Sequence, residues 1–361
     1  DLLSWKYAKD LPNDDHMTNA WLDSMTYKDF IEKVMGLDEA VTRFADPVLA
    51  SAGGMGCDVM SAYIAKQLGM YGLYPDAPVN PVNRHSFPGG NDGFARHFVK
   101  LLIPDSISGK NSFEDIMNNP INFNRLDHRD SRVRLRLSSN VINVHHKSES
   151  VNVTYYKNNE LTKVNAKAVV MASGGWINKH IISDLPKSHK EAYDQFNHAP
   201  MLVANVALTN WRFLKKLGIT AYQWSGGFGF HTNIRKPMHV GNYKPDLDPD
   251  KPITLTFYVS FEKTNQGLSA IEQSRLGQYE MLGKSFMQYE REIREQMVRM
   301  FSSSGFDPKN DIAGIILNRW GHAYVTPTPG FFYTPEGDPG YADIIKTKPF
   351  GRVSFGHSEL R

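Results

Sequence analysis

A short apolar run that ends in small residues and two glycines is the feature that most constrains the fold of this chain. Residues 166–175 read AKAVVMASGG. In open α/β sheets, ligands lie beyond the carboxyl ends of strands, and a turn with little side-chain bulk lets a dinucleotide or flavin approach the backbone. The segment therefore predicts either the ligand-facing end of a buried strand or a tight strand-to-loop turn without a ligand.

The residues before this run predict more strands. Between residues 132 and 172, apolar and polar side chains alternate, which is typical of strands, and two consecutive asparagines at 158 and 159 are typical of a hairpin turn. The sequence therefore predicts three or four short strands here. Besides the run at 166–172, they are expected at 133–137, 141–144 and 151–155.

Helices are predicted on both sides of these strands. Thr26 and Asp29 have the spacing of a helix cap, so we expect a helical region of about seventy residues at the start. After an interruption by prolines and glycines, we expect a helix from Asp92 that docks through an apolar face including Phe94 and Phe98. Residues 253–259 predict a strand, and residues 283–301 predict an amphipathic helix with one face in the core.

The length predicts more than one structural part. The 361 residues exceed the ~150 that are usual for one domain, and the mixture of elements is typical of an α/β and α+β chain. We expect a helical region at 1–80, a first sheet domain at 81–190, a second, mixed-sheet domain at 191–345, and a return strand to the first at 346–361.

Composition and charge exclude several classes of protein. The formal net charge is only +3 with the basic residues scattered, which argues against a nucleic-acid partner, and no apolar run approaches the ~18 residues of a membrane span. The single cysteine, Cys57, rules out an internal disulfide and a cysteine-rich metal or iron–sulfur site. His145 and His146 point to opposite faces of a predicted strand, so no metal site is expected. Redox chemistry would need a cofactor.

The usual glycine fingerprint for dinucleotides is absent. Residues 53–56 read GGMG before a helix-like run, but no buried strand leads into them, so they are a weak candidate for a phosphate loop. Residues 226–229 read GGFG without a helix signal after them, which predicts a loop. A nucleophile elbow is missing as well.

A second informative run is residues 315–325, between Gly314 and two prolines. As a strand, its alternation places Asn318, Trp320, His322 and Tyr324 on one face. Such a face would suit a planar cofactor and a cationic amine, because aromatic faces attract ammonium groups. The alternative is a half-exposed strand whose aromatic side chains pack against a neighbouring element.

Several blocks of the sequence resemble the flavin-dependent amine oxidoreductase superfamily, and within it the bacterial spermidine dehydrogenases. The resemblance spans most of the chain. It is carried by residues 83–91, the strands at 141 and 168–175, residues 351–359, and five blocks in a fixed order: 267–269, 289–294, 305–308, 311–314 and 318–322.

The resemblance implies an FAD-binding domain of the glutathione-reductase-like, amine-oxidase type, together with a mixed-sheet substrate domain. Two elements of that domain are not matched, namely the N-terminal strand–glycine–helix unit and the closing helix. We therefore expect an incomplete FAD-binding domain in a fragment of a longer enzyme, with weak FAD binding or none by this chain alone.

The resemblance also implies roles for particular residues. Trp320, His322 and Tyr324 would form the catalytic wall beside the flavin and the substrate. Val141 would lie against the adenine. The remaining expected cofactor contacts are Gly89, Gly90, Ala172, Ser173, Gly174, His357, Ser358 and Glu359.

The implied activity is oxidation of an amine C–N bond, with a hydride equivalent passing to FAD and later hydrolysis of the imine. A polyamine is the expected substrate. Some members of the family carry haem, and a homodimer and a bacterial cytoplasmic or periplasmic location stay open. Two alternatives also remain: a desaturase or porphyrinogen-oxidase-like enzyme acting on an apolar substrate, and a non-catalytic binding remnant.

Overall fold

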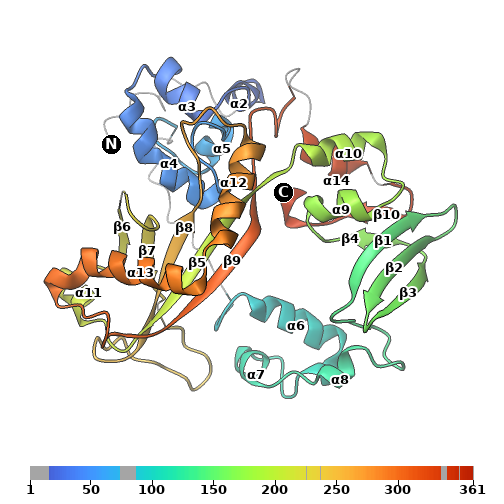
Figure 1. The fold of residues 1–361 in the computed structure, drawn as a ribbon. Helices are drawn as coiled ribbons and strands as arrows, with labels where there is room; N and C mark the ends of the chain where they lie inside the picture. Colours follow the sequence, from blue (N-terminus) through green and yellow to red (C-terminus); the bar gives the residue numbers. More distant parts are fainter. Residues whose placement is uncertain are drawn as a thin grey trace.

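Two long antiparallel strands, β5 (Asn197–Leu208) and β9 (Ile312–Thr326), pair in the larger sheet of the fold. The computed structural model describes residues 16–73, 87–224, 226–235, 237–334, 340–348 and 350–360. Figure 1 shows β5 and β9 side by side along one half of the molecule, with helices clustered at one end of them and a second group of strands and helices beside them.

β5 lies inside a five-stranded sheet with the order β6-β7-β8-β5-β9. It pairs antiparallel with β8 (Ile253–Ser260) on one side and with β9 on the other. The strand expected at 253–259 is therefore confirmed. The two remaining strands of the sheet are β6 (Ala221–Gln223) and β7 (His231–Ile234).

Helices cover the five-stranded sheet and close its core. Side chains of α13 (Phe286–Phe301) pack with those of β5 and β8 in one apolar cluster that includes Phe213, Phe257 and Phe301. The expected amphipathic helix is thus confirmed, but it begins at Phe286 because Ser285 caps it, and Gly283 instead ends the preceding helix. The other elements here are α11 (Arg212–Leu217), α12 (Ala270–Gly283) and η3 (Ser302–Ser304).

The N-terminal part is helical, as expected. The Thr26 hydroxyl accepts a hydrogen bond from the Asp29 backbone N–H and caps the helix there. Gly54 ends α4 in the left-handed conformation, which glycine adopts more readily than other residues. The glycines at 53–56, the weak candidate for a phosphate loop, therefore lie at the end of a helix. The elements are α2 (His16–Asp23), α3 (Tyr27–Asp29), η1 (Phe30–Val34), α4 (Glu39–Gly53) and α5 (Ala62–Gln67).

The second group of elements contains two small sheets. β1 (Asn140–His146), β2 (Val151–Lys157) and β3 (Glu160–Ala166) form an antiparallel sheet, and the expected turn at Asn158 and Asn159 joins β2 to β3 with both residues at positive φ. β4 (Val169–Met171) pairs in parallel with β10 (Val353–Phe355), so the strand expected at 166–172 is confirmed for its central residues, while Ala166 ends β3. The helices are α9 (Gly175–Ile181), α10 (Lys187–Asp194), α14 (Tyr341–Thr347) and η4 (Ser358–Leu360).

The strand predicted at 133–137 is wrong. These residues lie in irregular structure, where the Arg134 and Arg136 side chains reach back to the carboxylate of Asp127. Alternating arginines and apolar residues imitate the pattern of a strand, but no neighbouring strand pairs with this segment in the described residues.

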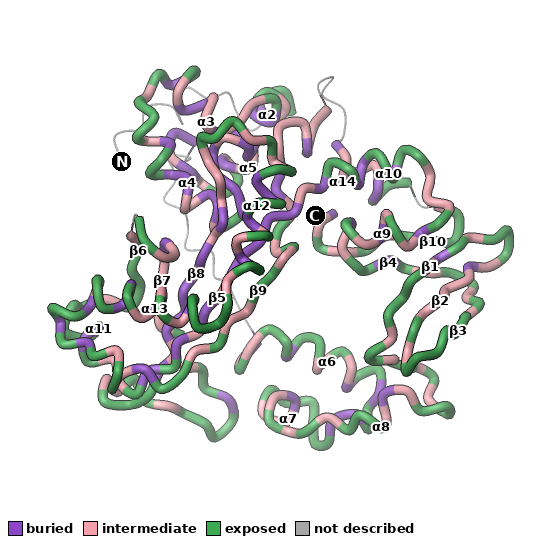
Figure 2. The backbone as a smooth tube through the Cα atoms, in the orientation of Figure 1, coloured by how far each residue is buried: buried purple, intermediate pink, exposed green. Residues whose placement is uncertain are grey.

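The docked face predicted for the helix at residue 92 is also wrong. α6 (Asp92–Leu102) forms, but Phe98 is 59% exposed and Phe94 48% exposed. Figure 2 shows this helix and its neighbours largely exposed, in contrast to the buried course of β5 and β8. The neighbouring short helices are η2 (Pro104–Ser106), α7 (Phe113–Asn118) and α8 (Phe123–Leu126). The division into domains at 80, 190 and 345 stays a prediction.

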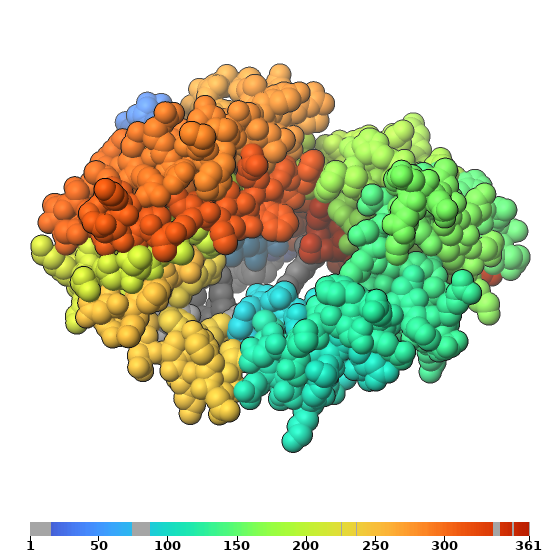
Figure 3. All heavy atoms as spheres, turned by 60° about the horizontal axis from the view of Figure 1, so that its bottom comes forward, coloured from blue at the N-terminus to red at the C-terminus, as the bar shows by residue number. Residues whose placement is uncertain are grey.

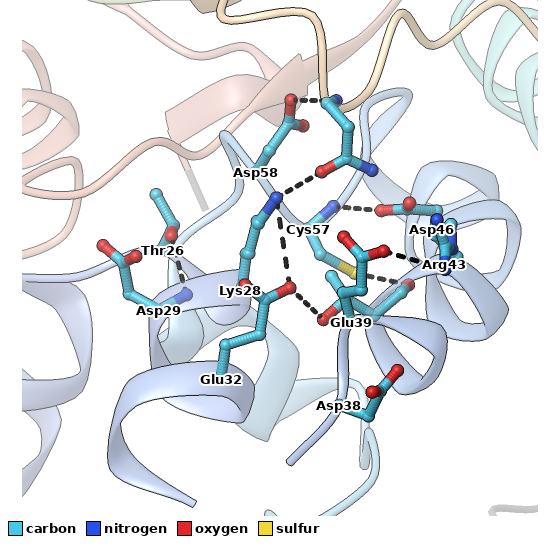
Figure 4. Close-up of polar contacts among 12 residues, drawn as sticks. Thr26, Lys28, Asp29, Glu32, Asp38, Glu39, Arg43, Asp46, Cys57 and Asp58 are labelled. Carbon is cyan, nitrogen blue, oxygen red and sulfur yellow. Dashed lines mark hydrogen bonds and ion pairs between the residues drawn. The ribbon is translucent and has the colours of Figure 1, made fainter. Parts of the chain in front are cut away.

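A polar cluster among the N-terminal helices joins them to the loop between β8 and α12 (Figure 4). Asp46 accepts a hydrogen bond from the backbone N–H of Cys57, and Asp58 accepts one from the backbone N–H of Asn265. Lys28 in turn bonds the Asn265 side chain. Burial, with Asp46 nearby, raises the pKa of the Cys57 thiol, so the lone cysteine is a neutral, unreactive core group.

Asp23 fixes the segment that precedes α14. Its carboxylate accepts hydrogen bonds from the Ser61 hydroxyl and from the backbone N–H groups of Phe332 and Tyr333. Burial raises its pKa from 3.8 to about 6 despite these bonds. Within the described ranges, none of the helices combines the length and the apolar character that a membrane span requires.

We predict that Asp23→Asn changes the pH dependence of stability. Because the folded state raises this carboxyl pKa, the stabilisation is fully present below pH 3.8 and is lost as the pH rises through about 6. The variant should not show this loss. Thermal unfolding of both proteins between pH 4 and about 7 measures the difference, with the exposed Asp92→Asn as control. A constant difference between wild type and Asp23→Asn would contradict the prediction.

Candidate functional site

A pocket of about 490 Å³ lies where four parts of the chain meet. Figure 3 shows the molecule hollowed between the orange-red residues of β9 and the dark-red residues near the C-terminus. The lining combines small residues, aromatic rings and one carboxylate. The pocket residues are Ala52, Gly53, Ile64, Leu68, Ala172, Gly174, Trp176, His322, Ala323, Tyr324, Val325, Pro327, Phe331, Phe332, His357, Ser358 and Glu359.

An irregularity between β5 and β9 shapes this end of the sheet. Ala199 pairs with Tyr324 and Met201 with Trp320, so the single residue Pro200 faces three residues of β9. Proline has no N–H to donate to the ladder, and an interruption of this kind bends a strand. The bulged residues of β9 include His322, which lines the pocket.

The indole of Trp176 and the imidazole of His322 stack face to face. Their ring centroids lie 3.9 Å apart at an interplanar angle of 6°. A third ring, His198 of β5, approaches His322 edge-on at 5.7 Å. The stack brings the first turn of α9 against β9 and gives the pocket a flat aromatic wall.

The carboxylate of Glu359 joins three segments at the pocket wall. Its Oε1 accepts a hydrogen bond from Nε2 of His198 at 2.8 Å, and its Oε2 accepts one from the backbone N–H of Gly175 at 2.7 Å. Nδ1 of His357 lies 3.4 Å from the same Oε2. The side chain is only 15% exposed, so its charge acts in a low-dielectric setting.

A second chain of hydrogen bonds lies behind the pocket. The Ser173 hydroxyl bonds Oδ1 of Asn178, and Nδ2 of Asn178 donates to the Tyr193 hydroxyl. That hydroxyl is 3.1 Å from Nε2 of His357. The network holds the turn after β4 and the C-terminal segment in one arrangement.

Burial and charge set the protonation states in the pocket. Burial, together with the nearby His198, lowers the pKa of His322, so its ring is neutral near pH 7. Burial also lowers the pKa of His357. Burial opposes ionisation of Glu359, but the hydrogen bonds from His198 and Gly175 outweigh it and lower its pKa. The pocket therefore combines neutral imidazoles with one carboxylate anion.

The turn after β4 leaves no space for larger side chains. A Cβ atom on Gly174 would lie 2.7 Å from Nε1 of Trp176, and one on Gly175 would lie 2.6 Å from the Tyr193 ring. A side chain at either position would therefore displace a neighbouring aromatic ring. Nδ1 of His357 is buried without a hydrogen-bond partner in the described residues. This small-residue cradle beside stacked rings suits a planar, hydrogen-bonding ligand.

The structure brings most of the predicted site residues together. Ala172, Gly174, His322, Tyr324, His357, Ser358 and Glu359 all line the pocket. Ser173 lies just behind it, bonded to Asn178.

Four predicted residues lie elsewhere. Trp320 is 58% exposed and does not line the pocket, although it lies on the same strand as His322. Val141 is on β1 and partly exposed. Gly89 and Gly90 line a different pocket of about 680 Å³, beside Met117. The roles expected for all the predicted residues stay predictions.

Sequence reasoning missed His198 and Trp176. His198 sits on β5, which was not recognised as a strand, and Trp176 follows the glycine turn without a motif of its own. The signal that could have found Trp176 is its place just after the strand–glycine run. Nothing in the local sequence marks His198.

Comparisons with known proteins identify the fold. No protein-family model and no curated protein matches the chain. Among solved structures, cyclohexylamine oxidase from Brevibacterium oxydans IH-35A matches with a TM-score of 0.57 at 15% identity, over 98% of this chain and 67% of that chain. Wild-type putrescine oxidase bound to putrescine matches with a TM-score of 0.53 at 14% identity and the same coverage.

These likenesses place the chain in a structural class. The chain has the fold of the amine oxidases, so the predicted α/β and α+β architecture of that type is confirmed. At this identity the likeness concerns the fold. Among the described residues, no group of three or more His, Cys, Asp or Glu side chains is placed to hold a metal ion.

We predict that Glu359→Gln lowers the pKa of His322 further. The Glu359 carboxylate raises this pKa, while burial and His198 lower it, so removing the negative charge leaves only the lowering causes. Histidine NMR titration of wild type and variant measures the shift. Glu149→Gln, which removes an exposed carboxylate bonded to Arg352, is the control. A His322 pKa that stays the same or rises in Glu359→Gln contradicts this assignment.

Proposed function

We propose that this protein takes part in FAD-dependent oxidation of amines. The observation that carries the proposal is the convergence of the β4 turn, the Trp176–His322 stack and the Glu359 carboxylate on one pocket of an amine-oxidase fold. The pocket volume of about 490 Å³ lies within the range of small-molecule sites. The resemblance of the sequence to flavin-dependent amine oxidoreductases supports the same conclusion.

The residues around the pocket fit the flat ring system of FAD. Ala172 and Gly174 would admit it close to the backbone, and Trp176 and Tyr324 would flank it. The segment 357–359 would supply polar contacts. When bound, FAD would supply an acceptor for the hydride equivalent that an amine loses on oxidation.

The protein's own groups would prepare the amine. An amine gives up a hydride only as the neutral base, and a site with few water molecules favours that form. The aromatic rings of Tyr324, Phe331 and Phe332 exclude water, and burial raises the pKa of Tyr324 so that its phenol stays uncharged. The Glu359 anion and the ring faces would attract the ammonium form of the amine as it enters, and that group would release its proton to solvent before the oxidation.

We further propose a polyamine or diamine as the substrate, with a spermidine-dehydrogenase-like reaction. Support comes from the five ordered sequence blocks between residues 267 and 322 and from the diamine bound in one structural neighbour. The ionised Glu359 carboxylate in the pocket favours an amine over an apolar substrate.

We predict that the protein purified from its own gene carries or takes up FAD and that anaerobic spermidine bleaches the flavin absorption. Gly174→Ala should weaken FAD binding about tenfold or more, which corresponds to about 1.4 kcal/mol, because the new Cβ pushes Trp176 away from His322. Spectral titration with FAD measures both. Gly314→Ala, whose Cβ would meet nothing within 4 Å, is the matched control and should bind FAD like wild type.

The outcomes separate the alternatives. A protein that binds no FAD would refute the proposal. A protein that binds FAD but is not reduced by any amine would support the non-catalytic alternative. Equal FAD affinity in Gly174→Ala and wild type would show that the ring system lies elsewhere.

A further inference from the structure

His198 is a buried residue beside the pocket that has no assigned role in the proposed oxidation. It lies on β5 opposite Val325 of β9, and its side chain is only 4% exposed. Its backbone carbonyl accepts a hydrogen bond from the Ser274 hydroxyl of α12. The strand and α12 therefore hold the backbone of His198, and Nε2 of its ring hydrogen-bonds Glu359.

The carboxylate that His198 bonds still has acceptor capacity. A carboxylate offers about four lone-pair sites. Hydrogen bonds from His198 and from the backbone of Gly175 occupy one site on each oxygen, and Glu359 lines the pocket. The remaining lone pairs can accept a hydrogen bond from a ligand, provided that the carboxylate is ionised and keeps its orientation.

We propose that His198 is a positioning residue that keeps the Glu359 carboxylate ionised and oriented as an acceptor for a donor group of the bound ligand. The inference rests on the proposed function and names the chemistry of its site. The donor is an N–H or O–H group, carried either by the amine substrate or by the flavin cofactor. His198 itself acts through Glu359 and does not line the pocket.

Among the side chains that face Glu359, His198 is the main one that favours its ionised form, beside the backbone N–H of Gly175. His357, on the same segment, has a pKa lowered chiefly by burial and is neutral near pH 7. His322 of β9 is neutral for the same reason. Tyr193 of α10 is an uncharged phenol, because burial raises its pKa. Of these side chains, only His198 makes a hydrogen bond to the carboxylate.

A purely structural tie is the competing interpretation. In that interpretation, the His198–Glu359 hydrogen bond only holds β5 to the C-terminal segment. Such a role needs a hydrogen-bond donor at residue 198 but no effect on the ionisation of Glu359. His189 provides a matched comparison: it is equally buried, and its Nε2 bonds the carbonyl oxygen of Lys348, but it does not line the pocket. His189→Gln is therefore the control for loss of a buried histidine tie.

The first test needs no ligand. Carboxyl-selective ¹³C NMR of the full chain should show the Glu359 resonance titrating at higher pH in His198→Gln than in wild type, and unchanged in His189→Gln. Thermal unfolding of the three proteins measures the structural contribution separately. An unchanged Glu359 titration in His198→Gln, with a loss of stability like that of His189→Gln, would overturn the proposal.

The second test distinguishes the two donors. If the donor is on the amine, His198→Gln should raise the KM for spermidine about tenfold with FAD affinity unchanged, and Glu359→Gln should do the same without a further effect in the double variant. If the donor is on the flavin, FAD affinity should fall instead. Unchanged KM and FAD affinity in both single variants would refute the ligand-binding part.

Failure of the proposed function would look different. In that case the wild-type protein would bind no FAD, or would bind FAD without being reduced by any amine. The carboxyl titration would still decide whether His198 controls Glu359.

Discussion

The pairing of β5 with β9 is the constraint on which the rest of the structure depends. β5 hydrogen-bonds on both edges, so it fixes β8 on one side and the 15-residue β9 on the other. The ladder is interrupted only near its ends, and the interruption at Pro200 follows from the missing N–H of proline. Because three residues of β9 face that one proline, the strand leaves its regular course where His322 reaches the pocket. A backbone property of one residue thus shapes the candidate site.

At this pocket, the Glu359 carboxylate connects elements that are far apart in the sequence. It bonds His198 on β5 and the backbone of Gly175 at the start of α9. A buried charge is costly unless it is paired and hydrogen-bonded, and these two bonds satisfy that requirement. The site therefore combines rigidity with a charge that a cationic or hydrogen-bonding ligand can recognise. Rigidity of this kind would serve the proposed oxidation, because cofactor and substrate would have to meet in a defined geometry.

Local patterns predicted elements well where the sequence and the tertiary environment agree. The strand at 253–259, the turn at Asn158 and the cap at Thr26 depend on nearby residues, and all are found. The strand expected at 133–137 failed because alternation alone does not supply a pairing partner. The docked face of α6 failed because periodicity shows which side chains share a face, such as Phe94 and Phe98, but not what lies opposite.

Sequence patterns and the family resemblance together predicted the kind of fold and many of the residues that line the site. The strand and glycine turn at 166–175 and the strand through His322 could be predicted because strand periodicity and glycine conformation are local properties, whereas the amine-oxidase type of the fold was implied by the resemblance. The tertiary structure alone decided which residues share the pocket: it brought in His198 and Trp176, and it left Trp320 outside. Residues far apart in sequence meet through strand register and a proline-induced bulge, and neither can be read from the spacing of residues along one segment.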